Sequence, residues 1–323
     1  MRARVLLWHC LAALLWLWAP AALAAYPDKP IRLIVPSAAG GAPDILMRTL
    51  ATQLSLQMGV PFVIENKPGA AFVIGTMDVV RATPDGYTLG YGNIVSLATN
   101  RSLMAKVPYD VDKDLTLISN ALRVVNLLVV NNDLPVKNFA ELIAYAKRNP
   151  GKLVQGTAGN GTTGHLGGEL LRMMTQTSMV HVPYKAATAA ATDLIGGQVH
   201  VMFENTPVLA PHVQAGRMRA LAISGAQRSP NYPDIPTVAE SGVPGFDVAG
   251  WGGIIGPANM PPEIVARLNT EIRAALASPA VRERFKTLDA EVVPSTPEEF
   301  RDYARRETAK WARVIKESGA KLD

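Results

Sequence analysis

The chain has 323 residues, a formal net charge of +5 at neutral pH and one cysteine. This length suffices for two domains with their own hydrophobic cores. A mild positive excess without a stripe of lysine and arginine excludes a typical nucleic-acid-binding protein, so we expect no nucleic-acid partner. The single cysteine excludes a disulfide-rich scaffold. These bulk properties predict a soluble, exported α/β protein of two domains.

The first residues have the pattern of a secretory signal. Arg2 and Arg4 precede an apolar run over residues 5–18, and the small residues 22–24 provide an A-x-A cleavage site. We therefore expect residues 1–24 to be a signal peptide that directs the protein to the periplasm. The alternative is a retained membrane anchor, which the proline after the apolar run disfavours. The only cysteine lies in this segment, so a cysteine nucleophile is not expected in the exported chain.

Residues 31–54 read as a strand, a glycine-bearing loop and a helix. The apolar run Ile31–Val35 is typical of a buried parallel strand. Asp44 is expected to cap or open the following helix. Free N–H groups and the positive end of the helix dipole then face the loop and form an anion site. An ordinary β-α turn without a ligand is the alternative. The loop residues are Ser37, Ala38, Ala39, Gly40 and Gly41.

Similar units follow along the chain and predict a doubly wound, mostly parallel sheet. Such sheets bind ligands beyond the carboxyl ends of their strands. Further strands are expected at 62–64, 87–92, 127–130, 153–157, 180–183, 199–203 and 220–223, and further helices after Gly69-Ala70-Ala71-Phe72, at 139–147, 164–174 and 186–195. Two helices are expected to close the chain, one from Pro261 and one from Thr296, where Thr296 and Glu299 have the spacing of a capping box.

Residues 159–164 match G-x-G-x-x-G between a predicted strand and a predicted helix. This spacing is found in dinucleotide sites, but such a site needs an acidic residue at the end of the next strand. The strand at 180–183 has no acidic residue there. The loop serves equally well as a backbone cradle for a carboxylate, with the hydroxyls of Thr162 and Thr163 as further donors.

Enzymatic motifs are missing from the sequence. It has no G-x-S-x-G elbow and no H-x-x-x-H or H-E-x-x-H zinc motif. The scattered histidines are interpreted as structural hydrogen-bonding residues, and we expect no metal and no cofactor. A general acid/base pair formed only in three dimensions is still possible, so a secreted α/β enzyme acting on a small acid remains the alternative function.

Polar residues at two further strand ends are candidates for ligand contacts. Tyr184 and Lys185 follow the strand at 180–183, and Glu204 follows the strand at 199–203. Lys185 could pair with an anionic ligand or with Glu204. Glu204 could repel anions or bind an amino group. Trp251 is interpreted as a packing residue near the domain junction.

In this order, the motifs resemble the Bug (TctC-type) family of periplasmic solute-binding proteins, the extracytoplasmic receptors of tripartite tricarboxylate transporters. The resemblance covers residues 26–323. It rests on YPDKPIRLIVPSAAGGAPD, IENKPGA, ATPDGYTLGYG, GTAGNGTTGHLGGELL, HVPYKAATAAATDLIGGQVHVMF, GRMRALAIS, DIPTVAESGVPGF and TPEEF.

This resemblance implies a two-domain clamshell of the type II periplasmic-binding-protein fold, each domain being a mostly parallel sheet flanked by helices. Domain one would comprise residues 25–124 and 250–323, and domain two residues 125–249. The implied function is capture of a small organic acid and its delivery to the membrane subunits of a tripartite tricarboxylate transporter, by a monomer that is not an enzyme. A sensor docking on a signalling protein is a further alternative.

The resemblance also implies where the ligand lies. In the family, two loops of domain one hold a ligand carboxylate through backbone N–H groups and ordered water, and domain two holds the other end. Carried over to this sequence, the site comprises Ser37, Ala38, Ala39, Gly40, Gly41, Asp44, Gly69, Ala70, Ala71, Phe72, Gly159, Asn160, Gly161, Thr162, Thr163, His165, Tyr184, Lys185, Ala186, Thr188 and Glu204.

Several of these positions depart from the family pattern. The family usually has two prolines at positions 38 and 39, and small, glycine-rich residues at 71–73. Ala186 and Ala189 stand where Gly and Pro are usual, and Glu204 where Asp is frequent. A Phe72 that points into the cleft would shrink it or favour an apolar or aromatic acid. An unusual ligand is therefore the hypothesis.

Overall fold

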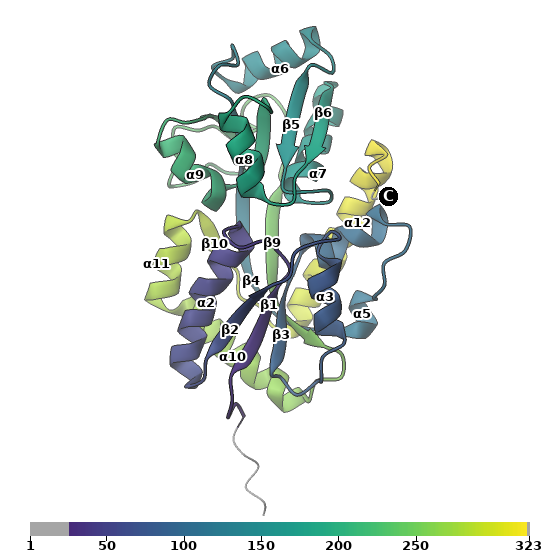
Figure 1. The fold of residues 1–323 in the computed structure, drawn as a ribbon, viewed down its shortest axis with the longest axis vertical. Helices are drawn as coiled ribbons and strands as arrows, with labels where there is room; N and C mark the ends of the chain where they lie inside the picture. Colours follow the sequence, from purple (N-terminus) through teal and green to yellow (C-terminus); the bar gives the residue numbers. More distant parts are fainter. Residues whose placement is uncertain (1–25, 322–323) are drawn as a thin grey trace, which may run out of the picture.

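The computed structural model describes residues 26–321 and has two lobes, one above the other in Figure 1. One hydrogen-bonded sheet system runs through both, in the strand order β2-β1-β3-β9-β4-β7-β5-β6, with β8 and β10 also paired to β4. In each lobe the strands are flanked by helices, which gives the predicted α/β architecture. The signal peptide expected at residues 1–24 lies outside the described residues.

The first lobe contains the predicted β-α units. Its strands β1, β2 and β3 are parallel, and β1 is almost wholly buried, as its apolar run indicates. The elements are β1 (Ile31–Val35), α2 (Ala42–Met58), β2 (Phe62–Asn66), α3 (Val73–Val80), β3 (Thr88–Asn93), η2 (Val95–Thr99), α4 (Asn100–Leu103) and α5 (Val111–Asp114).

Two long strands connect the lobes. β4 (Leu115–Val130) pairs with β9 (Ala249–Pro257) along residues 115–125, then with β7 and β8 along residues 126–130. The sequence predicted only the last part of β4 and did not predict β9. Glycines, which are rare in strands, obscured β9, yet Gly253 is required there because an added Cβ would lie 2.0 Å from the Ser119 carbonyl oxygen.

The second lobe repeats the parallel β-α arrangement. β5 pairs in parallel with both β6 and β7, and β5 and β6 run toward the first lobe (Figure 1). The elements are α6 (Phe139–Arg148), β5 (Leu153–Thr157), α7 (Thr163–Thr175), β6 (Met179–Pro183), α8 (Ala187–Ile195), β7 (Val201–Asn205), α9 (Thr206–Gln214) and β8 (Arg219–Ile223).

The chain returns to the first lobe after β9. It forms α10 (Pro262–Ala277), α11 (Pro279–Thr287), β10 (Ala290–Val292) and α12 (Pro297–Ser318). The expectation of only two closing helices was wrong, because Ser278 ends α10 and its side chain accepts the N–H of Val281 to begin a separate helix. The capping box of Thr296 and Glu299 at the start of α12 is confirmed.

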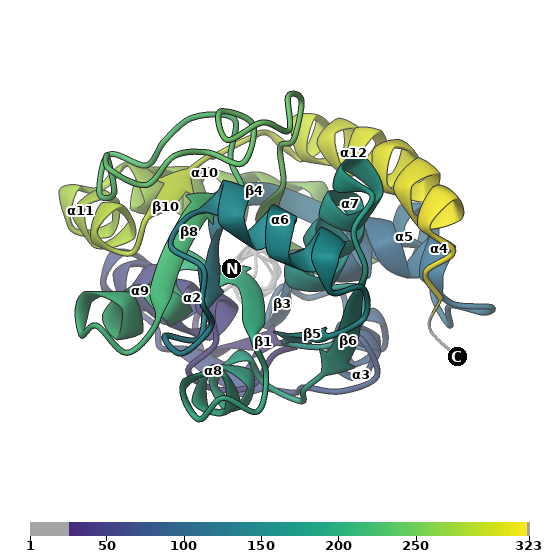
Figure 2. The same ribbon diagram turned by 90° about the horizontal axis from the view of Figure 1, so that it is seen from above.

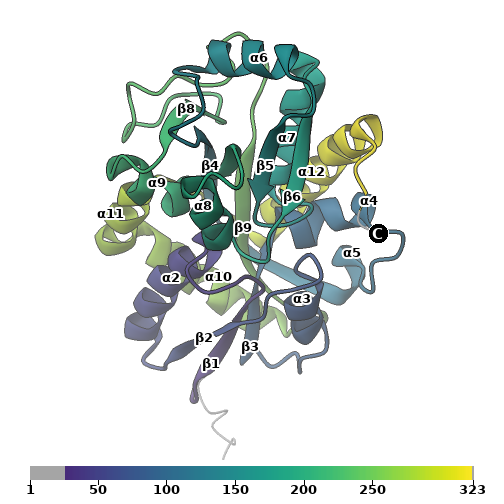
Figure 3. The ribbon, with the colours of Figure 1, turned by 45° about the horizontal axis from the view of Figure 1, so that its top comes forward.

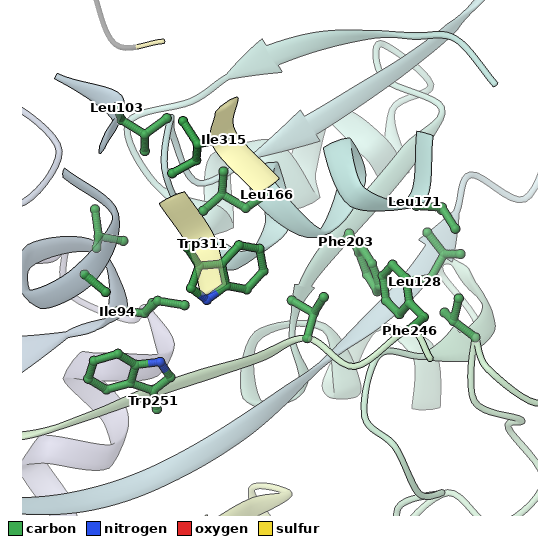
Figure 4. Close-up of a cluster of buried hydrophobic side chains, with 14 of the residues drawn as sticks. Ile94, Leu103, Leu128, Leu166, Leu171, Phe203, Phe246, Trp251, Trp311 and Ile315 are labelled. Atoms are coloured by element: carbon green, nitrogen blue, oxygen red, sulfur yellow. The ribbon is translucent and has the colours of Figure 1, made fainter. Parts of the chain in front are cut away.

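Helix α12 joins the lobes. It packs against β4 and η2 and also lies beside α7 of the second lobe (Figure 2). Its Trp311 belongs to the same buried cluster as Leu166 and Phe203 of the second lobe and Trp251 of β9 (Figure 4). Trp251 is therefore the packing residue that the sequence predicted. In the described part of the chain, no helix is long and apolar enough to cross a membrane.

Candidate binding site

A cavity of about 620 Å³ lies between the lobes. Loops at the carboxyl ends of β1, β2, β5, β6 and β7 line it, together with residues of β3, β4 and β9. Its size is in the range of small-molecule sites. The lobes approach one another closely at its edge: a Cβ placed on Gly40 would lie 4.0 Å from the Thr188 methyl group, and α8 lies above α2 in Figure 3.

Helices of both lobes begin at this cavity. Their unpaired N–H groups and dipoles give the cavity a positive potential without a basic side chain in its interior. The residues that line the cavity at these helix starts are Ala42 and Pro43 of α2, Phe72 before α3, Thr162 before α7 with Thr163 of α7, Ala186 before α8 with Ala187 of α8, and Asn205 before α9.

Asp44 shapes the first loop from behind. Asp44 was expected to cap or open the helix. It lies in the first turn of α2, but Gly41 is the N-cap residue, and Asp44 is buried outside the cavity lining. Its carboxylate accepts the Gly40 N–H at 2.9 Å, the Asn66 side-chain amide at 2.9 Å and the Arg48 guanidinium at 2.9 Å. Burial opposes ionisation of Asp44, but these donors outweigh it and hold the pKa of its carboxyl below the usual value. Asp44 therefore fixes the loop.

Ser37 is the polar residue of this loop among those that line the cavity. Its hydroxyl oxygen is buried and has no hydrogen-bond partner among the described residues. Buried polar atoms are normally paired, so this hydroxyl is available to a ligand.

The second loop is strained. Gly69, Ala70, Ala71 and Phe72 have consecutive positive φ angles of 122°, 45°, 49° and 70°. This conformation costs residues with a Cβ roughly 1–2 kcal/mol each. The Asn100 side chain donates to the Ala71 carbonyl at 2.8 Å and helps to hold the loop. All four residues line the cavity.

A histidine outside the cavity shapes the loop of the second lobe. His165 is buried, accepts the Gly161 N–H at 3.0 Å through Nδ1, and stacks on His181 with ring centroids 4.2 Å apart. Thr157 hydrogen-bonds to His181 at 2.7 Å. Burial lowers the pKa of each imidazole to about 4, so both are neutral at pH 7.

Tyr184 and Lys185 differ in how firmly they are held. The Tyr184 hydroxyl donates to Asp193 at 2.6 Å, and this hydrogen bond raises the pKa of Tyr184 to about 12. Lys185 is exposed where it borders the cavity. Within residues 26–321, no ion pair joins Lys185 to Glu204, so the structural pairing considered from the sequence is not formed.

Glu204 lies at the end of β7 and lines the cavity with its side chain almost fully buried. Its Oε1 accepts the Asn205 N–H at 2.8 Å, and the Ala158 backbone also hydrogen-bonds to the carboxylate. Its Oε2 has no partner in the described part of the chain. Burial raises the pKa of Glu204 to about 7 despite these backbone donors.

The structure brings most predicted site residues together around one cavity. Those that line it are Ser37, Ala38, Gly41, Gly69, Ala70, Ala71, Phe72, Gly159, Asn160, Thr162, Thr163, Tyr184, Lys185, Ala186, Thr188 and Glu204. Ala39, Gly40, Asp44, Gly161 and His165 are not among the lining residues. Asp44 and His165 lie behind the cavity-lining loops and accept the N–H groups of Gly40 and Gly161, respectively. They support the loops and do not line the cavity themselves.

Sequence reasoning missed the inner walls of the cavity. These residues include Tyr91, Asn93, Ile94, Val95, Leu122, Val124, Asn205 and Trp251. They come from β3, η2, β4, β7 and β9, and most are apolar residues that the sequence does not distinguish from the core. Among these residues, only Asn205 has a sequence feature typical of a ligand site, because it is a polar residue at the end of a strand.

Two α/β lobes that share crossing strands and enclose a cavity at their strand ends define a two-domain periplasmic-binding-protein fold of the clamshell type. The sequence model described as "Tripartite tricarboxylate transporter family receptor" matches residues 46–320. The chain belongs to this family of substrate-binding receptors, which confirms the predicted resemblance.

Similar proteins agree with this assignment. The chain is 38% identical over 305 residues to protein BugT of Bordetella pertussis, covering 94% of each sequence. Among solved structures, Rpa4515 of R. palustris with adipate is 37% identical with a TM-score of 0.89, covering 92% of this chain and 100% of that one. MatC (Rpa3494) of Rhodopseudomonas palustris with bound malate is 30% identical with a TM-score of 0.84, covering 90% of this chain and 100% of that one.

Proposed function

We propose that this receptor binds a small organic acid by its carboxylate in the cavity between the lobes. The observation that carries the proposal is the convergence of helix starts from both lobes on one cavity. In the described part of the chain, the only lining side chains that carry charge near neutral pH are Lys185 and Glu204. An anion is the ligand that such a field favours. The adipate and malate of the similar structures support the same chemical class.

The first lobe supplies the better carboxylate site. The Ser37 hydroxyl is buried without a partner in the described residues, and it lies beside the start of α2. Asp44 holds the loop in shape by accepting the Gly40 N–H. A carboxylate here would accept a hydrogen bond from the hydroxyl and from loop N–H groups, in keeping with the family's mode of binding.

The closeness of the lobes supports capture by closure. The loop at Gly161 touches the first lobe, where an added Cβ would lie 2.9 Å from Leu103, and the Thr99 hydroxyl lies 3.5 Å from the Gly161 carbonyl oxygen. A ligand that contacts both lobes gains all its contacts only in this arrangement, so binding shifts the population toward it.

The partner and setting belong to the same proposal. The receptor would act as a periplasmic monomer, without catalysis, and would present the closed form to the membrane subunits of a tripartite tricarboxylate transporter. Residues 25–124 and 250–323 would move as one domain and residues 125–249 as the other. The β4 and β9 strands that cross between the lobes support this division.

A thermal-shift screen tests the proposed function. The protein is refolded from denaturant to remove any co-purified ligand, then screened against mono-, di- and tricarboxylates, amino acids and aromatic acids. A ligand at a thousand times its Kd stabilises a receptor by about 4 kcal/mol, which is a shift of roughly 8–16 °C. The proposal predicts such a shift for an acid that is recovered unchanged. A flat panel contradicts binding, and conversion of the acid favours the enzyme.

A further inference from the structure

Several hydrogen-bond donors at the second-lobe end of the cavity are already used within the protein. Glu204 Oε1 already accepts the Asn205 N–H, and the Ala158 backbone also hydrogen-bonds to the carboxylate. The Gly161 N–H is bonded to His165. The Thr162 hydroxyl donates to the Gly159 carbonyl at 2.8 Å. These donors of the loop before α7 and of the end of β7 are thus already engaged within the protein.

The same end presents a free acceptor. Glu204 is 5% exposed, lines the cavity, and its Oε2 is buried with no hydrogen-bond partner among the described residues. An unpaired buried carboxylate oxygen is costly, and a ligand group that donates a hydrogen bond would remove that cost. A cationic donor would also balance the buried negative charge.

No cation in the described part of the chain performs this role. The charged and titratable groups on the elements around β7 are engaged elsewhere, distant along their helix or exposed. His165 is bonded to Gly161, Arg172 to Glu169, Asp193 to Tyr184 and Arg123 to Asp247. His212 lies in the last turn of α9, and Lys185 is exposed at the cavity edge. Within residues 26–321, none forms an ion pair with Glu204.

We propose that Glu204 makes this receptor selective for amino acids, with the ligand carboxylate at Ser37 in the first lobe and its ammonium group at Glu204 Oε2 in the second. The inference rests on the proposed function and specifies its ligand class. A dicarboxylate would instead place its second carboxylate against the Glu204 carboxylate. The two negative charges repel each other, so this arrangement would require protonation of Glu204.

Calorimetric titration of a matched ligand series tests the proposal on the wild-type protein. The series contains the standard amino acids and ω-amino acids of three to six carbons, each beside the monocarboxylate that lacks the ammonium group and the dicarboxylate of equal length. The tightest ligand is expected to carry an ammonium group, and its removal should weaken binding roughly tenfold or more, the value of a hydrogen-bonded charge.

Two variants identify the residue responsible. Glu204→Gln keeps the shape but loses the charge, so binding of the amino acid should weaken roughly tenfold or more while binding of the matched monocarboxylate stays unchanged. Glu298→Gln, an exposed residue in the first turn of α12, is the matched control and should bind like the wild type. Thermal melts confirm that both variants are folded. Lowering the pH from 8 to 5.5 should weaken amino-acid binding, because protonation of Glu204 removes the acceptor charge.

The opposite pattern would overturn the inference. A dicarboxylate that binds more tightly than any amino acid, more tightly still at low pH, and equally well to Glu204→Gln would make Glu204 a protonated donor. That result would leave the receptor function standing. Failure of every acid to bind would instead contradict the proposed function itself.

Discussion

Trp251 and Trp311 donate their indole N–H groups to the same oxygen, Oε2 of Glu307, each at 3.0 Å. Trp251 belongs to β9 and Trp311 to α12, and both are fully buried. One carboxylate therefore ties the helix that joins the lobes to a strand that crosses between them.

Glu307→Ala should destabilise the protein strongly. It leaves two buried indole donors without an acceptor, at a cost of about 2–5 kcal/mol. Glu307→Gln keeps an acceptor oxygen for both and is expected to cost less than about 1 kcal/mol. Denaturant unfolding measures both variants. Equal stabilities for the two would show that the shared acceptor contributes nothing.

Ala71→Gly should stabilise the protein. Ala71 has a φ of 49°, and glycine removes the steric cost of that conformation at the price of a more flexible unfolded chain. The net gain is about 0.5–1 kcal/mol. Ala274→Gly, at an exposed position within α10, is the control and should destabilise by a similar amount. A loss of stability in Ala71→Gly would contradict the strain assigned to this loop.

The stacked histidines should make the fold sensitive to mild acid. His165 and His181 have pKa values of about 4 when folded, against an ordinary value near 6.5. Between these values the unfolded chain binds more protons, so the unfolding free energy should fall as the pH drops from 7 to 5, by on the order of 2 kcal/mol per histidine.

His181→Gln isolates this effect. The amide can still bond to Thr157 but does not titrate, so the pH dependence of stability between pH 5 and 7 should become shallower than in the wild type. Denaturant unfolding at several pH values provides the measurement. An unchanged slope in His181→Gln would mean that this histidine is not buried in its neutral form.

Ser37→Ala should weaken ligand binding without unfolding the protein. The hydroxyl has no protein partner to lose among the described residues, so stability should change little. A hydrogen bond to a charged group is worth about 1.5–3 kcal/mol, which predicts roughly a 10- to 100-fold rise in Kd for the bound acid. Ser102→Ala on α4, away from the cavity, is the control. Unchanged affinity in Ser37→Ala would place the carboxylate elsewhere.

The sequence predicted the parts of the site that local patterns encode. Buried runs such as Ile31–Val35, followed by glycine loops and helix starts, predict loops at strand ends, and these loops line the cavity. The capping box at Thr296 was equally local and is confirmed. The roles of Asp44 and His165 could not be predicted, because they depend on which loop N–H each side chain reaches.

Long-range pairing explains the other misses. β4 contains polar residues such as Asn120 and Asn126 that interrupt its apolar pattern, and β9 is rich in glycine, yet both are central strands. Leu122 and Val124 look like core residues in sequence, and only the pairing of β4 with β9 brings them to the cavity.

Blocking the cavity tests whether the acid binds between the lobes. Ala186 lines the cavity before α8, whereas Ala189 on the same helix is exposed and does not line it. Calorimetric titration would compare Ala186→Trp and Ala189→Trp with the wild type, using the acid that gives the thermal shift. We expect one ligand per chain for the wild type and Ala189→Trp, and a Kd at least about thirtyfold higher for Ala186→Trp, since overfilling a site costs about 2 kcal/mol or more. Wild-type affinity in Ala186→Trp would contradict binding between the lobes.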